Sequence, residues 1–141
     1  MASLLEPNRT KVLQPELTIT ASRTIVGEEV AIGPGTRSLA VQSTFAYGSS
    51  GTSCKTYVQT SIDGGTTWAD ISCHAFATTA AKKVSAVRTH IALAAGVTPS
   101  DGTLTDNTIL DGLLGDRMRC KTVVVGTYAG ASSIKVSVVL N

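Results

Sequence analysis

The stretch that most constrains the fold is residues 57–76, YVQTSIDGGTTWADISCHAF. On both sides of its centre, residues alternate with the period of two that is expected of a half-buried strand. One face of the first arm would hold Val58, Thr60 and Ile62, and one face of the second Ile71, Cys73 and Ala75. Between the arms, Asp63-Gly64-Gly65 supplies residues that tolerate the positive φ of a short hairpin loop. The stretch therefore predicts a β-hairpin whose arms pair in a sheet.

The centre of this hairpin fits the pattern S-x-D-x-G-x-T-W, through Ser61, Asp63, Gly65, Thr67 and Trp68. It resembles the Asp-box hairpin of sialidases and other β-propellers. In such a turn the aspartate carboxylate accepts hydrogen bonds from turn amides, the glycine takes the left-handed conformation, and the tryptophan packs over the hairpin. Propellers repeat the motif blade after blade, whereas it occurs once in this chain, which is too short for four blades. We therefore predict a structural role for these residues.

The rest of the chain consists of short alternating segments separated by turn residues. They predict strands at 16–26, 30–32, 37–47, 82–93, 117–127 and 133–140. Residues 82–93 also fit one face of a helix, but their Thr and Val content and their β neighbours favour a strand. The pattern predicts an all-β domain at residues 16–141, a β-sandwich or jelly roll of seven to eight antiparallel strands. Residues 1–15, MASLLEPNRTKVLQP, have no period and contain two prolines, which predicts an extended N-terminal arm.

A long turn-rich segment, residues 94–116, precedes the strand at 117–127. Its aspartates recur every five residues, at positions 101, 106, 111 and 116. A calcium loop places its oxygen ligands at every second position, so this spacing indicates turns and not a metal site. Loops of this length in a small domain are usually functional or form an interface.

Composition excludes several function classes. The 141-residue chain has a net charge of +2, only 16% charged residues and 4% aromatic residues. With no basic run longer than Lys82-Lys83 and no set of aromatics for base stacking, we expect no nucleic-acid binding. Arg117, Arg119 and Lys121 share one strand face and predict a solvated or partner-facing stripe. No apolar run of about 18 residues and no leader pattern is present, so we expect neither a membrane span nor secretion.

Catalytic constellations are missing as well. His74 and His90 are the only histidines. Cys73 and His74 are adjacent on a strand and would face opposite ways, so they cannot act directly as a nucleophile–base pair. Asp63 and Asp70 could be considered as a glycosidase pair, but the turn already explains Asp63. We therefore expect a non-enzymatic protein without a cofactor or a metal.

Three cysteines, Cys54, Cys73 and Cys120, make an odd set without zinc-site spacing. Two interpretations stay open. They are small core residues in a reducing compartment, or at least one of them cross-links to a neighbouring subunit.

Two segments of the chain resemble small β-sandwich proteins encoded among the virion genes of tailed bacteriophages. They are SLAVQSTFAYGSSGTSCKTYVQTSIDGGTTWADISCHAF and LLGDRMRCKTVVVGTYAGASSIKVSVVL. The resemblance spans about residues 37–141 and implies a structural component of the virion, either a capsid decoration (cement) protein or a neck, collar or tail component. It further implies a homo-oligomer assembled in the host cytoplasm that contacts capsid or neck proteins, with no membrane partner. The arm at residues 1–15 lies outside the resemblance, and its docking partner is open.

Two alternative functions remain. A carbohydrate-binding β-sandwich module would use the Asp box together with Tyr47, Tyr57 and Tyr128, if these tyrosines are exposed. A hydrolase would depend on Asp63.

Overall fold

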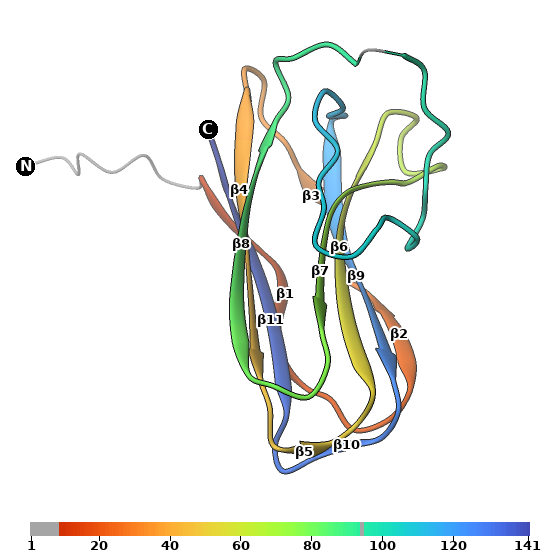
Figure 1. Cartoon of the computed structure of the whole chain (residues 1–141). Coiled ribbons are helices and arrows are strands. Elements are labelled where there is room, and N and C mark those ends of the chain that lie inside the picture. The colour runs from red at the N-terminus through yellow and green to blue at the C-terminus, as the bar shows by residue number, and fades with distance from the viewer. Residues whose placement is uncertain (1–8, 94) are drawn as a thin grey trace, which may run out of the picture.

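The computed structural model describes residues 9–93 and 95–141, and every regular element within them is a β-strand (Figure 1). Eight strands have four to nine residues: β1 (Thr10–Thr18), β2 (Arg23–Val26), β4 (Ser38–Ala46), β6 (Ser53–Ser61), β7 (Ala69–Phe76), β8 (Ala81–Arg88), β9 (Arg117–Val125) and β11 (Ser133–Leu140). Three strands have only two residues: β3 (Val30–Ala31), β5 (Ser49–Ser50) and β10 (Tyr128–Ala129).

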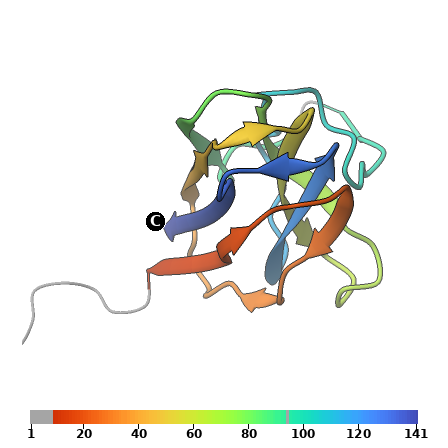
Figure 2. The same cartoon turned by 90° about the horizontal axis from the view of Figure 1, so that it is seen from below.

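The strands form two sheets that pack face to face (Figure 2). Sheet A has the order β1-β11-β4-β8, and sheet B has the order β2-β9-β6-β7, with β3 also pairing with β9. The short strands β5 and β10 pair with each other at one end of the sandwich (Figure 1). The prediction of an all-β sandwich is confirmed.

The pairing of the eight longer strands is nested. The first pairs with the last (β1 with β11), the second with the second-last (β2 with β9), and β4 with β8. The innermost pair is β6 with β7, the hairpin that is most evident in the sequence. Two four-stranded sheets built from a chain that folds back on itself in this way form a jelly roll.

The N-terminal boundary differs from the prediction. Residues 10–15, expected to belong to the arm, lie in β1, which pairs with β11 along the edge of sheet A. Pro15 obscured the strand pattern, but proline is tolerated on an edge strand because the missing N–H faces away from the sheet. The register of β1 shifts on both sides of Gln14, which breaks the period of two. The remainder of the predicted arm, residues 1–8, lies outside the described residues.

Two further segments differ from the prediction. The strand expected at 16–26 is the end of β1 and all of β2, which belong to different sheets. The regular alternation predicted for the second arm of the hairpin is also interrupted. The pairing of β7 with β6 shifts register between Val58 and Gln59, so His74 points between the sheets and Cys73 lies on the outer side opposite Tyr57. A single extra residue in one strand reverses every side chain beyond it.

The interior contains two apolar clusters with a polar layer between them. The larger cluster holds eleven buried residues, among them Leu13, Val58 and Val136, and the smaller one holds seven, among them Phe45 and Tyr128. A chain of hydrogen bonds of 2.7–3.0 Å lies between the clusters and connects Thr56, Ser43, His74 and Ser85 in that order. The hydroxyl and imidazole groups satisfy one another, so the layer links both sheets without leaving a buried polar group unpaired.

Candidate functional site

The Asp-box hairpin joins β6 to β7, and the side chain of Asp63 organises it. Asp63 Oδ1 accepts hydrogen bonds from the Thr67 amide (2.7 Å) and the Ser61 hydroxyl (2.9 Å), and Ser61 Oγ accepts one from the Gly65 amide (2.9 Å). The bond from the Thr67 amide is the main reason why the pKa of Asp63 lies below its ordinary value. Gly64 and Gly65 have φ values of 73° and 93°, which favour glycine.

Trp68 closes the hairpin and is almost fully buried. Its indole Nε1 donates a hydrogen bond to the Gly65 carbonyl (3.0 Å), and the Arg119 guanidinium lies 4.2 Å from the centre of its ring. The ring is therefore covered on one side by a cation and is not free to stack on a ligand. The residues of this motif hold each other, and their polar atoms do not converge on an open space.

The long connection between β8 and β9 is fastened to sheet B by a buried carboxylate. Asp70 accepts hydrogen bonds from the backbone amides of Gly102, Thr103 and Leu104 at 2.8–3.1 Å, and one from Gln59 Nε2 at 2.8 Å. Hydrogen bonds to an ionised carboxylate are stronger than neutral ones. Asp70 therefore fixes the loop against the outer face of β7, which excludes it from acting with Asp63 as a pair of free carboxylates.

The same connection also covers the outer edge of β7. Cys73 N donates to the Thr108 carbonyl (3.0 Å), and Leu110 N donates to the Ile71 carbonyl (3.0 Å). An uncovered edge strand invites pairing with other chains. This long loop thus has an identifiable structural task, because it closes the edge of sheet B.

Each of the four regularly spaced aspartates forms an ion pair with a Lys or Arg side chain on a strand. The ion pairs are Asp101 with Arg119 and Lys121, Asp106 with Lys55, Asp111 with Arg88, and Asp116 with Arg117. The predicted stripe of Arg117, Arg119 and Lys121 is therefore only partly solvated, because its cations pair with acidic residues of this chain. The signal was present in the sequence as matching charges, but their partners are fixed only by the tertiary fold.

All three cysteines are fully buried, with unbonded thiols. Burial raises the pKa of Cys54 and of Cys120 to about 12, and it also raises the pKa of Cys73. Cys54 lies in the core, whereas Cys73 lies on the outer side of β7 beneath the long connection, so these two are not neighbours across the hairpin. None of the three thiols is exposed in the folded chain, so a cross-link to a neighbouring subunit would require the fold to open locally around the cysteine.

The tyrosines do not form an exposed platform. Tyr57 and Tyr128 are buried, and the Tyr128 hydroxyl donates to the Ala77 carbonyl at 2.7 Å. Tyr47 is half-buried, with its ring edge-on to Tyr128. The exposure on which the carbohydrate-binding alternative depended is therefore lacking at Tyr57 and Tyr128 and only partial at Tyr47.

His74 belongs to the polar layer of the interior and is 2% exposed. Its Nδ1 lies 2.8 Å from Ser43 Oγ, and its Nε2 lies 2.7 Å from Ser85 Oγ. Desolvation, and secondly the nearby Lys83 ammonium, lower its pKa to about 4. An imidazole that resists protonation so strongly is a poor general base near neutral pH. Within residues 9–93 and 95–141, no group of His, Cys, Asp and Glu side chains could hold a metal ion.

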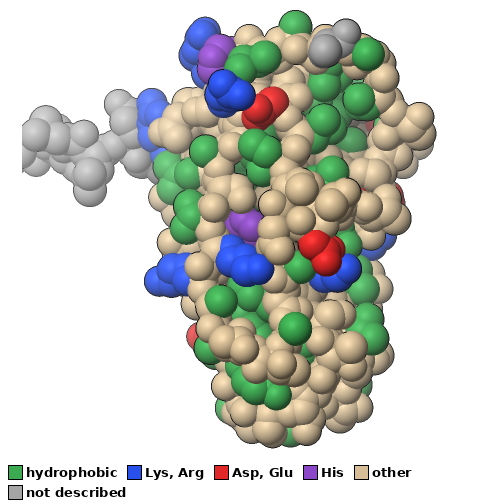
Figure 3. All heavy atoms as spheres, viewed as in Figure 1, with side chains coloured by type: hydrophobic (Ala, Val, Ile, Leu, Met, Phe, Trp, Pro, Cys, Tyr) green, Lys and Arg blue, Asp and Glu red, His purple; other side chains and the backbone are tan. Residues whose placement is uncertain are grey.

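An apolar cavity of about 480 Å³ lies between the Asp-box hairpin and the start of the long connection. Its apolar lining includes Ile62, Val97 and Leu113, and Figure 3 shows hydrophobic side chains gathered at this end of the molecule. Two of its polar residues, Thr60 and Asp63, are engaged in hydrogen bonds within the protein. No convergent set of polar groups points into this cavity.

Among the described residues, no segment covers the outer face of sheet A, in contrast to that of sheet B. Two adjacent rows of residues cross its four strands without a charged side chain: Thr10, Val139, Ala40 and Ala86, then Val12, Ser137, Gln42 and Val84. Val84 is 65% exposed, Val12 47% and Val139 38%. Lys135 and Lys82 lie in the next row along. This surface consists of neutral, small and aliphatic side chains with Lys82 and Lys135 at its border.

No family model, curated protein or solved structure matches this chain. In the described part of the chain, no helix is long and apolar enough to cross a membrane.

Proposed function

We propose that this chain is a non-enzymatic structural protein of a tailed-bacteriophage virion, a capsid decoration (cement) protein or a neck–collar component that acts through oligomeric contacts. The observation that supports this most directly is the asymmetry of the sandwich. The chain's own loop covers part of the outer face of sheet B, while no described segment covers that of sheet A, where Val12, Val84 and Val139 are exposed. Exposed apolar surface of this kind marks an interaction site.

The fold supports the same proposal by analogy. Jelly rolls occur in viral capsid proteins, but also in lectins and cupins, so the fold alone does not define the function. The lectin-like alternative loses support because its aromatic residues are buried or half-buried. A rigid sandwich with an open face can make many weak contacts with its copies, and repeated contacts add up on a symmetric particle.

The proposal predicts a homo-oligomer that depends on the open face of sheet A. We expect the purified protein to be oligomeric at micromolar concentration, and we expect Val84→Asp to shift it towards monomers by about tenfold or more, since a charge would be buried in the contact. Sedimentation equilibrium measures this shift.

Val26→Asp is the matched control, because Val26 is also an exposed strand valine, 49% exposed, but it lies on β2 in sheet B. Thermal unfolding of both variants separates loss of assembly from loss of folding. A wild-type protein that stays monomeric, or equal dissociation by both substitutions, contradicts the proposed contact. Mass spectrometry of purified virions tests incorporation directly, and absence of the chain from the particles contradicts the virion role.

A further inference from the structure

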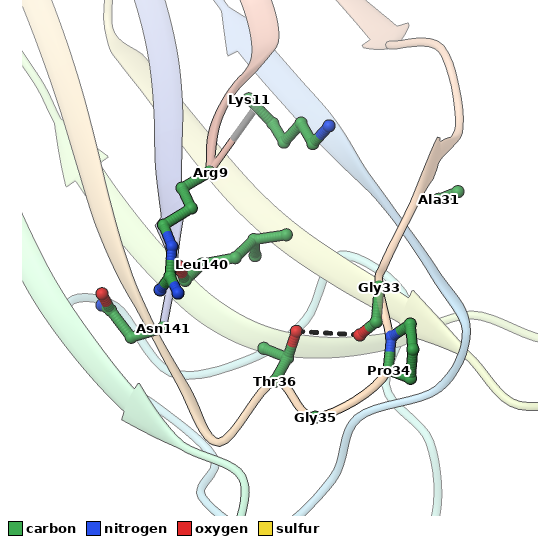
Figure 4. A pocket seen from close by; sticks show the side chains of 9 residues that line it. All are labelled: Arg9, Lys11, Ala31, Gly33, Pro34, Gly35, Thr36, Leu140 and Asn141. Carbon is green, nitrogen blue, oxygen red and sulfur yellow. Dashed lines mark hydrogen bonds between the residues drawn. The ribbon is translucent and has the colours of Figure 1, made fainter. Parts of the chain in front are cut away.

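A second concave site lies at one end of sheet A, apart from the open face. It is a cavity of about 340 Å³ between the start of β1, the turn at residues 33–36 and the end of β11. Figure 4 shows Arg9 and Lys11 reaching from the first strand and the Gly33–Thr36 turn facing them. Gly35 has a φ of 82°, and a side chain at Gly33 or Gly35 would meet nothing within 4 Å, so the turn borders open space.

The charged side chains that line this cavity are both cations. Arg9 Nη1 donates to the Leu140 carbonyl at 3.3 Å, which leaves its other N–H groups available, and Lys11 is half-buried. Within the described residues neither forms an ion pair, whereas the sheet B cations Lys55, Arg117, Arg119 and Lys121 all do. Two cations without a side-chain counterion beside one cavity favour the binding of an anion there.

The surroundings add further basic residues. Arg37 follows the turn, and its amide donates to the Asn141 carbonyl at 2.6 Å. His90 Nδ1 lies 3.0 Å from the Arg37 carbonyl. Figure 3 shows Lys, Arg and His side chains gathered at this end of β4 and β8 with an acidic side chain among them, and Arg88 at the end of β8 is paired with Asp111. The Thr36 hydroxyl, which also lines the cavity, already donates to the Gly33 carbonyl at 3.0 Å. The charged donors left for a ligand are therefore those of Arg9 and Lys11.

Among the described residues, no carboxylate side chain pairs with Arg9 or Lys11. Most of the chain's described carboxylates are engaged: Glu29 and the four spaced aspartates in ion pairs, Asp63 in the hairpin and Asp70 with the loop. Glu28 is exposed, but its neighbour Glu29 is held by Arg117 at 3.0 Å. A site with two cations is best matched by two adjacent carboxylates, and the one adjacent pair among the described residues, Glu28 and Glu29, is already half engaged through Arg117.

We propose that this cavity binds an acidic segment of a different protein, with carboxylates pairing to the Arg9 guanidinium and the Lys11 ammonium. An arginine fork matches a carboxylate in two hydrogen bonds. A nucleic acid is disfavoured because the site is one short concavity with no exposed aromatic ring for base stacking. If the structural role proposed above is correct, the partner is another virion protein. The cavity and the open face are separate surfaces.

The test measures fluorescence anisotropy of a labelled oligoglutamate peptide with the full chain at low ionic strength. We expect binding that weakens with added salt and that falls by about tenfold or more in the double variant Arg9→Gln/Lys11→Gln, as expected for two lost charge-assisted bonds. The matched control, Arg23→Gln/Lys82→Gln, removes the same charge from two exposed cations elsewhere, and we expect at most about a twofold loss, because only the general field changes.

Three outcomes overturn the proposal: no peptide binding to the wild type, equal losses in both double variants, or tighter Arg9-dependent binding of a single-stranded oligonucleotide or of inorganic phosphate than of the peptide. Thermal unfolding shows that each variant is folded. Because Val84 takes no part, failure here leaves the proposed oligomer untouched, and failure of the oligomer leaves this site untouched.

Discussion

At the scale of single residues, His74 shows how burial changes a side chain's chemistry. It lies between Ser43 and Ser85, and its pKa is lowered to about 4. The unfolded chain would bind a proton near pH 6.5, so between these values the unfolded state holds more protons than the folded one. Stability from this group is therefore fully present above about pH 6.5 and is lost as the pH falls towards 4.

We predict that lowering the pH from about 7 to about 5 reduces the free energy of unfolding by about 2 kcal/mol through His74 alone. Urea unfolding at both pH values measures the change. His74→Gln should lack this part of the pH dependence, whereas His90→Gln, at an exposed position, should keep it. An identical pH dependence in the wild type and in His74→Gln would show that the imidazole is not the group responsible.

At the scale of elements, the connection between β8 and β9 is held by charges and not by regular structure. The Asp70 carboxylate accepts hydrogen bonds from the backbone amides of residues 102–104, and the spaced aspartates form ion pairs with cations on the strands. Because backbone hydrogen bonds to a buried carboxylate are strong, the connection should exchange its amide hydrogens slowly despite its lack of secondary structure.

Asp70→Asn is therefore expected to destabilise the protein by about 2 kcal/mol and to speed hydrogen exchange at residues 102–104 selectively, because an amide group cannot accept all of these bonds. Asp106→Asn is the control, since it removes an exposed ion pair with Lys55 that contributes about 0–1 kcal/mol. Hydrogen-exchange mass spectrometry measures the exchange rates of the loop amides directly. Unchanged exchange in Asp70→Asn would mean that this carboxylate does not anchor the loop.

At the scale of the whole molecule, the two ends of the described chain close the sandwich together. β1 pairs with β11, and Leu13 on β1 belongs to the larger apolar cluster. The N-terminal strand is thus part of the core and not an appendage.

We predict that Leu13→Ala lowers the free energy of unfolding by about 2–4 kcal/mol through a lost core side chain. Val12→Ala, its exposed neighbour on the same strand, should cost less than about 1 kcal/mol. Chemical denaturation compares the two variants. Equal effects of the two substitutions would contradict the packing of β1 in the core and would favour the extended arm that the sequence predicted for residues 10–15.

Much of the element structure follows from local sequence. The alternation in β4, β9 and β11 predicted which side chains are buried, because a strand between a core and an exterior has a period of two. The contacts of Asp63, Gly65 and Trp68 within the hairpin are similarly local, since all partners lie within a few residues.

Local sequence patterns are sufficient to predict a β-sandwich with one sharply defined hairpin at its centre. The three-dimensional fold was needed to show that Cys73 lies beneath a loop, that the spaced aspartates hold this loop against sheet B, and that no described segment covers the outer face of sheet A. These contacts join residues that lie many positions apart in the chain, so local patterns do not reveal them. A period of two predicts which side chains share a face of a strand, but it does not predict which segment covers that face.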